Sequence, residues 1–282
     1  MLPTSGCQLQ LQEGTITYKV KRELKHARTA PLLRQRLCHK HAWTDSAFED
    51  INWNSFGKSL RRHDKQRVTM VKYLNCCLPV GTLVNKYDKK YPINCPSCSA
   101  SIEDNEHLHR CPATSRIQWR KTCYTTMRKK LEQLKTPQHV QSLFLEGLQV
   151  MLQGQSATTI QIPLETTELA QSQRQIGWHH ILKGKLSNAW DDWNPQQEGT
   201  SWTTEIIDTI FTEWWKLWEL RNEDRHGRDQ HSRMATERAK ATHEVGAMYA
   251  LAAEVPELQW IVDTPVQEIT GYVYVNNIYG VV

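Results

Sequence analysis

The chain has 282 residues, of which 39% are hydrophobic, and a formal net charge of +5. Its 11 Trp and 9 Tyr are untypical of a disordered chain, and its length supports a core that does not depend on disulfides. No run approaches the ~20 apolar residues of a membrane span, and residues 1–12 lack the cationic start and the apolar run of a secretory signal. We therefore expect a folded intracellular protein of the nucleus or cytoplasm, with no membrane partner.

The charge is divided unevenly along the chain. Residues 1–135 hold 25 Lys and Arg against 11 Asp and Glu, whereas residues 136–282 hold 10 against 19. A basic half of this density favours a polyanionic partner, most simply nucleic acid, through neutralisation of phosphates and release of counterions. The alternative is that the basic half packs against the acidic half, which would leave no free cationic surface.

Hydrophobic spacing in the first third of the chain predicts helices after one short strand. Alternation favours the strand at 15–20. Helical spacing follows at 21–43, 46–64 and 68–78, with a break expected near Pro31. Asp45 or Ser46 would cap the second of these helices.

The later part of the chain is also expected to be helical. Its helical segments are 115–134, 138–152, 171–193 and 234–253, and Gly184 should interrupt the third of them. A lone strand is expected at 269–275. The clearest stripe is formed by Ile206, Ile207, Ile210, Phe211, Trp214, Leu217 and Trp218. Such a stripe is more often core than a stacking platform, so Trp214 and Trp218 are expected to be buried.

These elements predict a mainly α protein with a small Cys3His zinc knuckle inserted between helices. Three regions are expected: a basic helical segment at 1–90, the knuckle with a cationic helix at 91–135, and a Trp-rich acidic helical region with an irregular tail at 136–282.

Four of the residues that can bind a metal have the spacing of a closed zinc site. Cys95 and Cys98 form a C-x-x-C knuckle, and His107 and Cys111 follow as an H-x3-C pair. Three thiolates and one imidazole complete a tetrahedron around Zn²⁺ and leave no open position, so the ion would be structural. His109 is a competing ligand that should point to the other side of its helix. The alternative is a set of ordinary thiols near a solvated histidine.

The motif around these ligands resembles a known family. The run Cys95-Pro-Ser-Cys98, then Glu106-His107-Leu108, then Cys111, is similar to the zinc-binding region downstream of the reverse transcriptase in non-LTR retrotransposons. The sequences on both sides of the motif resemble the flanks of that region. They are Ile51-Asn52-Trp53 with the cationic run 58–72 upstream, and Leu217-Trp218-Glu219-Leu220-Arg221-Asn222 downstream. Another segment resembles retroelement-derived reading frames of algal or protist type. It comprises Gln175 to Trp178, residues 183–187 and Trp190. The resemblance covers roughly residues 15–250 and implies a detached tail of a mobile element.

Motifs for catalysis are not found in the sequence. The closest string to the aromatic-x-Asp-Asp turn of a polymerase, Lys86-Tyr87-Asp88-Lys89, lacks the second carboxylate that two-metal catalysis needs. No ribonuclease H carboxylate set follows Asn222, and Asp263 stands alone where an endonuclease would need further carboxylates and a lysine. We therefore expect no enzyme activity.

The expected function is non-catalytic zinc binding combined with nucleic-acid binding. If Ile117, Cys123, Met127 and Leu131 face the core, the cations of the helix at 115–134 project together towards phosphates. The expected phosphate contacts are Arg110, Arg116, Arg120, Lys121, Arg128, Lys129 and Lys130. The alternative is a structural or protein-interaction remnant whose Trp-rich C-terminal half packs on a protein partner.

Overall fold

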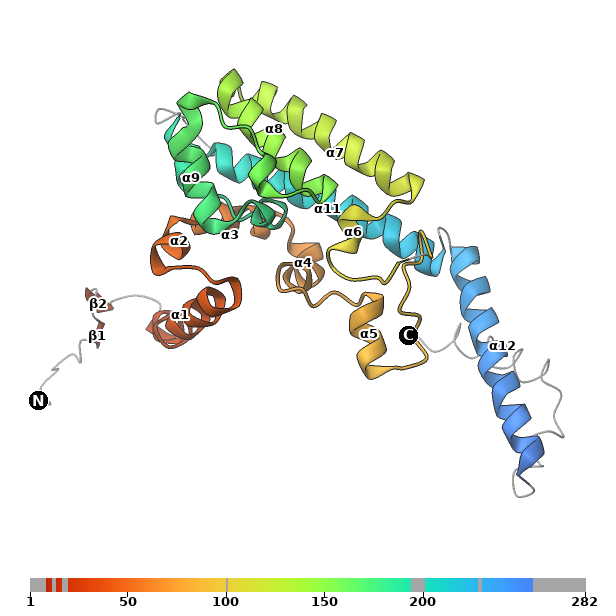
Figure 1. Cartoon of the computed structure of the whole chain (residues 1–282). Coiled ribbons are helices and arrows are strands. Elements are labelled where there is room, and N and C mark those ends of the chain that lie inside the picture. The colour runs from red at the N-terminus through yellow and green to blue at the C-terminus, as the bar shows by residue number, and fades with distance from the viewer. Residues whose placement is uncertain are drawn as a thin grey trace, which may run out of the picture. The chain divides into compact units, whose positions relative to one another are not determined.

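The computed structural model describes residues 9–11, 14–16, 20–99, 101–193, 201–227 and 230–255. Helices account for most of these residues, and the cysteine-rich loop lies between helices, so the predicted fold class is confirmed (Figure 1). Among the described residues, no helix is both long enough and apolar enough to cross a bilayer.

The chain forms two compact units, and each is built from two segments. The first unit combines Met1–Asn75 with Lys121–Thr212, and the second combines Cys76–Arg120 with Glu213–Val282. Helices α7 (Thr114–Gln133) and α11 (Trp202–His226) contribute residues to both units. The three regions expected from charge and composition remain a prediction.

The first unit contains a short hairpin and most of the helices. The hairpin pairs β1 (Leu9–Leu11) with β2 (Gly14–Ile16) in antiparallel register. The helices that lie wholly in this unit are α1 (Val20–His41), α2 (Asp45–Asp50), α3 (Trp53–Arg62), η1 (Asp64–Gln66), α4 (Arg67–Leu74), α8 (Gln138–Gln153), η2 (Ala157–Thr159), η3 (Leu164–Thr166), α9 (Thr167–Ile176), η4 (Trp178–Lys183) and α10 (Ala189–Asp192).

Aromatic rings make the centre of the first unit. Trp190 and Trp202 stack with ring centroids 5.4 Å apart, and Phe144 of α8 meets both rings edge-on. The two indole N–H groups donate to the side chains of Gln173 and Thr136, at 2.9 and 2.8 Å. Because each buried donor has an acceptor, the tryptophans bury a large apolar surface without leaving their polar atoms unsatisfied.

The second unit contains the cysteine-rich loop and the helices on either side of it in the sequence. Its elements are α5 (Gly81–Tyr87), α6 (His107–Arg110), the first turns of α7, the last turns of α11, and α12 (Gln230–Glu254). Trp119 of α7 donates from its indole nitrogen to the Glu213 carbonyl at 2.8 Å. Trp214 and Trp218 are 2% and 5% exposed, which confirms that both are buried.

The prediction of one continuous helix at 46–64 is wrong. Two helices form instead, α2 and α3, because Ile51 makes a β-bridge with Ser187 and the Asn52 side chain accepts the N–H of Ser55 to start α3. The cap of α2 is Thr44, whose hydroxyl accepts the Ala47 N–H, and neither Asp45 nor Ser46 serves that role.

Other expected boundaries also differ from those observed. Helix α1 continues through Pro31 without the predicted break, so the loss of one backbone donor is tolerated within 22 residues. The segment at 171–193 has the predicted interruption at Gly184, where φ is +68° and η4 ends. It has a second interruption that was not predicted, at Gly177, where φ is +102° and α9 ends. Strand β2 overlaps only the start of the strand expected at 15–20, and Val20 begins α1. The strand expected at 269–275 lies outside the described residues.

The expected inward face of α7 is largely correct. Cys123, Met127 and Leu131 are buried, as predicted. Ile117 is 40% exposed, so its expected place in the core is wrong. At the start of the helix it is Trp119 that is buried, and its indole N–H bonds to the backbone of α11.

Candidate metal centre

The four predicted metal ligands converge in the second unit. One ligand atom from each of Cys95, Cys98, His107 and Cys111 lies within 4.8 Å of all the others. Two of the separations are 3.7 Å, between the sulfurs of Cys95 and Cys111, and 3.5 Å, from Cys98 Sγ to His107 Nε2. This Cys3His group could therefore hold one metal ion.

The backbone shapes the first ligand pair into a tight turn. Asn94 and Ile102 form an isolated β-bridge that closes the loop. Inside it, the N–H of Ser97 points to Cys95 Sγ at 3.4 Å, and the Ser99 N–H donates to the Cys95 carbonyl at 2.9 Å. These bonds hold the C-x-x-C turn, in which the ligand atoms of Cys95 and Cys98 lie within 4.8 Å of each other.

The second ligand pair is placed by a single helical turn. The Asp104 carboxylate accepts the N–H groups of Glu106 and His107, at 2.9 and 2.6 Å, and so begins α6. Cys111 ends the same turn. Arg120 then donates to the carbonyls of His109 and Cys111, at 2.7 and 3.0 Å, which ties the turn to α7.

Electrostatics around the sulfurs favour a bound cation. Burial, together with the neighbouring thiols Cys95 and Cys98, raises the pKa of the Cys111 thiol to about 12. Clustered thiols of this kind ionise together when a divalent cation supplies the compensating charge.

The loop between the ligand pairs is anchored by a buried ion pair. Glu103 is fully buried and accepts two hydrogen bonds of 2.8 Å from Arg221 of α11, one from Arg225 at 3.3 Å and one from the Gly81 N–H at 2.7 Å. Burial alone would raise the pKa of this carboxyl, but the hydrogen bonds and charge of Arg221 hold the pKa below its usual value.

A second contact fixes the knuckle itself to α11. Ser97 donates to the Asp224 carboxylate at 2.7 Å, and Arg116 donates to both of these groups at 2.8 and 2.7 Å. Arg225 also donates to the Asn94 carbonyl at 3.0 Å. The end of α11 therefore holds both sides of the cysteine-rich loop.

No protein-family model, curated protein or solved structure matches this chain. The site is therefore interpreted from its own geometry.

The expected phosphate contacts are found in three kinds of surroundings. Arg116 is 1% exposed and pairs with Asp224, so it is not accessible to a phosphate. Arg120 is partly buried, and its Nη1 donates to two backbone carbonyls. Arg110 is exposed and pairs with Glu106 at 3.1 Å. The remaining four residues lie on α7 in the first unit: Lys121, Arg128, Lys129 and Lys130.

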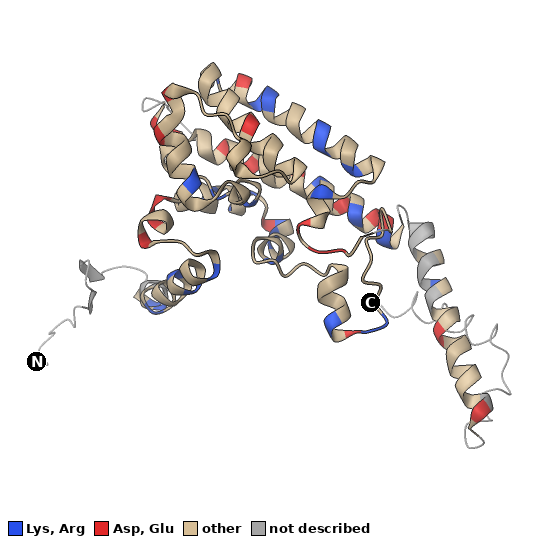
Figure 2. Ribbon diagram, viewed as in Figure 1, with Lys and Arg blue, Asp and Glu red and all other residues tan. Residues whose placement is uncertain are grey.

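These four cations on α7 differ in their partners. Lys130 donates to Glu205 at 2.6 Å, while the guanidinium of Arg128 lies 5.2 Å from the ring centre of Tyr124. Lys121 and Lys129 are exposed, and within the described part of the chain no carboxylate forms an ion pair with them. Lys and Arg positions recur along the ribbon of α7 (Figure 2). The exposed cations of α7 are thus Lys121, Arg128 and Lys129.

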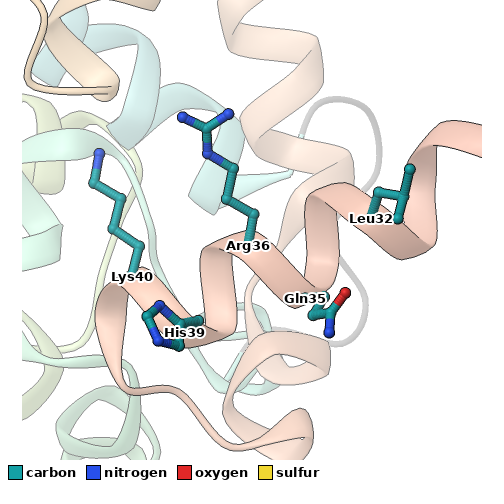
Figure 3. A pocket seen from close by; sticks show the side chains of 5 residues that line it. All are labelled: Leu32, Gln35, Arg36, His39 and Lys40. Carbon is teal, nitrogen blue, oxygen red and sulfur yellow. The ribbon is translucent and has the colours of Figure 1, made fainter.

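A shallow depression also lies on α1, and none of the predicted ligands lines it. Leu32, Gln35, Arg36, His39 and Lys40 line it, and all five come from that one helix (Figure 3). Lys40 is engaged, since it donates to the Asn75 carbonyl at 3.0 Å. Polar groups from several elements do not converge here, as they do in most ligand pockets.

Sequence reasoning missed the residues that support the metal ligands. Glu103 is the one acidic side chain of the loop that is fully buried, and nothing in its sequence spacing marks it. Arg221 lies in the run 217–222, and the sequence of that run does not indicate that Glu103 is its partner. The sequence pattern predicts Arg116 to be a phosphate contact because the neighbouring Arg and Lys residues are typical of a solvated face.

Proposed function

We propose that the chain is a non-catalytic zinc-binding module that binds nucleic acid. The zinc part rests on the Cys3His group. Zn–S bonds of about 2.3 Å and Zn–N bonds of about 2.0 Å give tetrahedral edges of roughly 3.8 Å between sulfurs and roughly 3.5 Å between sulfur and nitrogen. The separations of 3.7 and 3.5 Å agree with those edges.

The donor set also favours zinc as the resident metal. Three thiolates and an imidazole are soft to borderline ligands, which suit Zn²⁺ and disfavour Mg²⁺ or Ca²⁺. Cys95, Cys98, His107 and Cys111 would hold the ion with all four positions filled, so it would stabilise the loop and take no part in a reaction.

The observation that carries the nucleic-acid part is the exposed cations of α7. Lys121 and Arg128 are seven positions apart, which places them on one side of the helix, and Lys129 follows directly. Phosphates could replace the counterions of these side chains without breaking an internal ion pair. Lys130 is excluded from the proposal because it is already paired with Glu205.

One observation favours the alternative, a structural or protein-interaction module. Glu205 and Asp208 of α11 accept hydrogen bonds from Arg62 at 2.8 and 3.3 Å, and Lys130 also bonds to Glu205. Part of the basic charge of the first unit is therefore neutralised internally. The experiment below separates the two functions.

Anisotropy titrations of labelled DNA and RNA of unrelated sequences, at several salt concentrations, test the nucleic-acid function. Wild-type affinity should fall steeply with salt. The double variant Lys121→Glu/Lys129→Glu should bind all sequences more weakly and with a slope shallower by about two. Lys58→Glu/Lys65→Glu is the matched control, since it changes the net charge equally at exposed positions elsewhere in the same unit. Equal weakening by both pairs, or no binding at all, would reject α7 as the contact surface.

We further propose that the chain derives from the tail of a non-LTR retrotransposon polyprotein. The sequence resemblance supports this, and so does the burial of Leu217, Trp218 and Arg221 in the unit that carries the Cys3His group. Reading frames that share both motifs should carry them downstream of a polymerase Asp-Asp motif. Finding them only in frames without a polymerase would argue against this origin.

A further inference from the structure

The last residue of α5 presents an aromatic ring to solvent. Tyr87 is 86% exposed, and no described residue forms a hydrogen bond or ring contact with its side chain. A single exposed aromatic ring is common on soluble proteins and by itself indicates nothing. Its surroundings decide whether the ring has a role.

Three lysines surround this ring in the sequence, and all are exposed. Lys86, Lys89 and Lys90 make no ion pair with a carboxylate in the described ranges of the chain. The single acid among them, Asp88, accepts the Lys90 backbone N–H at 3.0 Å. Figure 2 shows more blue than red at the end of α5 and in the turn that follows it. The exposed ring of Tyr87 therefore belongs to a cationic stretch of the chain.

The turn is held in one conformation by its own hydrogen bonds. Asn85 donates from its side chain to the carbonyls of Lys89 and Tyr91, at 3.4 and 2.8 Å. The Tyr91 N–H donates to the Asp88 carbonyl at 3.1 Å. Such a turn loses little conformational entropy when a ligand binds.

The turn is also fixed to the supports of the metal centre. The guanidinium of Arg225 lies 5.1 Å from the centre of the Tyr91 ring, and Arg221 donates to the Tyr91 hydroxyl at 3.4 Å. Both arginines bond to Glu103, in the loop between the ligand pairs. The same network therefore anchors the metal loop and the base of the cationic turn.

We propose that Tyr87, with Lys86, Lys89 and Lys90, is a contact surface for single-stranded nucleic acid. The ring supplies a face on which one unpaired base stacks, and the ammonium groups neutralise the phosphates on either side. A duplex cannot use the ring in this way, because its bases are already stacked on one another. This inference rests on the proposed nucleic-acid function and adds to it a substrate class at a second surface.

The test compares single strands and duplexes on ring variants of the full zinc-loaded chain. Labelled single-stranded RNA, single-stranded DNA and a duplex of the same sequence are titrated with wild type, Tyr87→Phe and Tyr87→Ala. Loss of one stacked base costs about 1–3 kcal/mol, and about 1.4 kcal/mol is tenfold in affinity, so Tyr87→Ala should weaken single-strand binding about 5- to 150-fold. Tyr87→Phe should bind like wild type, and duplex binding should be the same for all three proteins.

A second variant checks the charge part of this surface. Lys89→Glu/Lys90→Glu should weaken single-strand binding and flatten its salt dependence, with unchanged zinc content. The RNA and DNA arms show which strand is preferred.

The outcomes distinguish this inference from the function on which it rests. Equal single-strand affinity of Tyr87→Ala and wild type would overturn the inference, while the proposed function would stand if Lys121→Glu/Lys129→Glu still weakened binding. A wild-type chain that binds neither strands nor duplex would overturn both.

Discussion

Glu103 and Arg221, 118 positions apart in the sequence, form a buried ion pair with two hydrogen bonds of 2.8 Å. Their side chains are 0% and 2% exposed. The pair joins the loop between the two metal-ligand pairs to helix α11, so the position of the ligands depends on a helix far from them in sequence.

Removal of Arg221 should destabilise the second unit and weaken metal binding. In Arg221→Met the Glu103 carboxylate keeps its burial and loses its main partner, which costs about 3–5 kcal/mol in comparable pairs. Metal affinity should fall about 10- to 100-fold, as it does when supporting residues of a metal site are lost. Urea unfolding and competition with a chelator measure both effects.

Two further variants make this prediction specific. Glu103→Gln/Arg221→Met should recover part of the stability, because the fully buried carboxylate is replaced by an uncharged amide, while the more exposed Arg225 loses only a contact of 3.3 Å. Glu219→Ala, on the exposed side of α11, should cost less than about 1 kcal/mol. If Arg221→Met were as mild as Glu219→Ala, the ion pair would not support the site.

The aromatic stripe of α11 should contribute strongly to stability. Trp214 is 2% exposed and stacks on Trp218 with ring centroids 6.2 Å apart. Trp214→Ala should lower the free energy of unfolding by about 3–5 kcal/mol. Trp215, which is partly exposed and bonds to Glu219, should be much less sensitive to the same change. Similar losses from both variants would speak against the packing described here.

Helices α8 and η4 approach each other closely at Gly147, so replacing this glycine should destabilise the protein. A methyl group on Gly147 would overlap the six-membered ring of Trp178. Gly147→Ala should therefore cost about 1–3 kcal/mol, as overpacked cores do. At Gly57 of α3 the nearest atom to such a methyl is the mobile Arg61 Nη1 at 3.6 Å, so Gly57→Ala should stabilise the helix by about 0.5–1 kcal/mol. Thermal unfolding of the two variants should shift in opposite directions, and shifts of the same sign would refute this pairing.

Buried imidazoles should make the first unit sensitive to acid. Burial lowers the pKa of His41 to about 3, with Lys185 adding to the effect. Burial also lowers the pKa of His180, whose ring is 1% exposed and whose two nitrogens have no hydrogen-bond partner. Below pH 6.5 the unfolded chain binds protons at these rings that the folded chain does not bind, so stability falls as pH falls.

A variant at His180 measures this contribution. One such imidazole makes the free energy of unfolding fall by about 1.4 kcal/mol per pH unit below its unfolded pKa. In His180→Phe, urea unfolding between about pH 4.5 and 6 should show a slope smaller by roughly that amount. An unchanged slope would show that His180 is protonated in the folded protein.

Local patterns in the sequence predicted the parts of this structure that depend on neighbours in the chain. The spacing of Cys95, Cys98, His107 and Cys111 was sufficient to predict the ligand group, because one short stretch of chain supplies all four ligands. The periodic apolar stripe of α11 was sufficient to predict that Trp214 and Trp218 are buried, because this long helix buries its apolar face.

Features set by distant contacts could not be predicted in this way. The helix expected at 46–64 breaks where Ile51 pairs with Ser187, and that partner is remote in sequence. The residues next to Arg116 in the sequence are typical of an exposed cation. Arg116 is nevertheless buried and forms an ion pair with Asp224 of another helix. Periodicity describes which face of a helix is apolar, but it does not identify the residue across the interface.

Native mass spectrometry, with and without a chelator, tests the central claim that Cys95, Cys98, His107 and Cys111 hold one structural zinc ion. The wild-type chain should carry one zinc, and Cys98→Ser and Cys111→Ser should carry none. Cys123→Ser should keep its zinc, because Cys123 is buried in α7 outside the ligand group. Loss of zinc from Cys123→Ser equal to that from Cys111→Ser, or a wild-type chain that binds no zinc, would contradict the assignment.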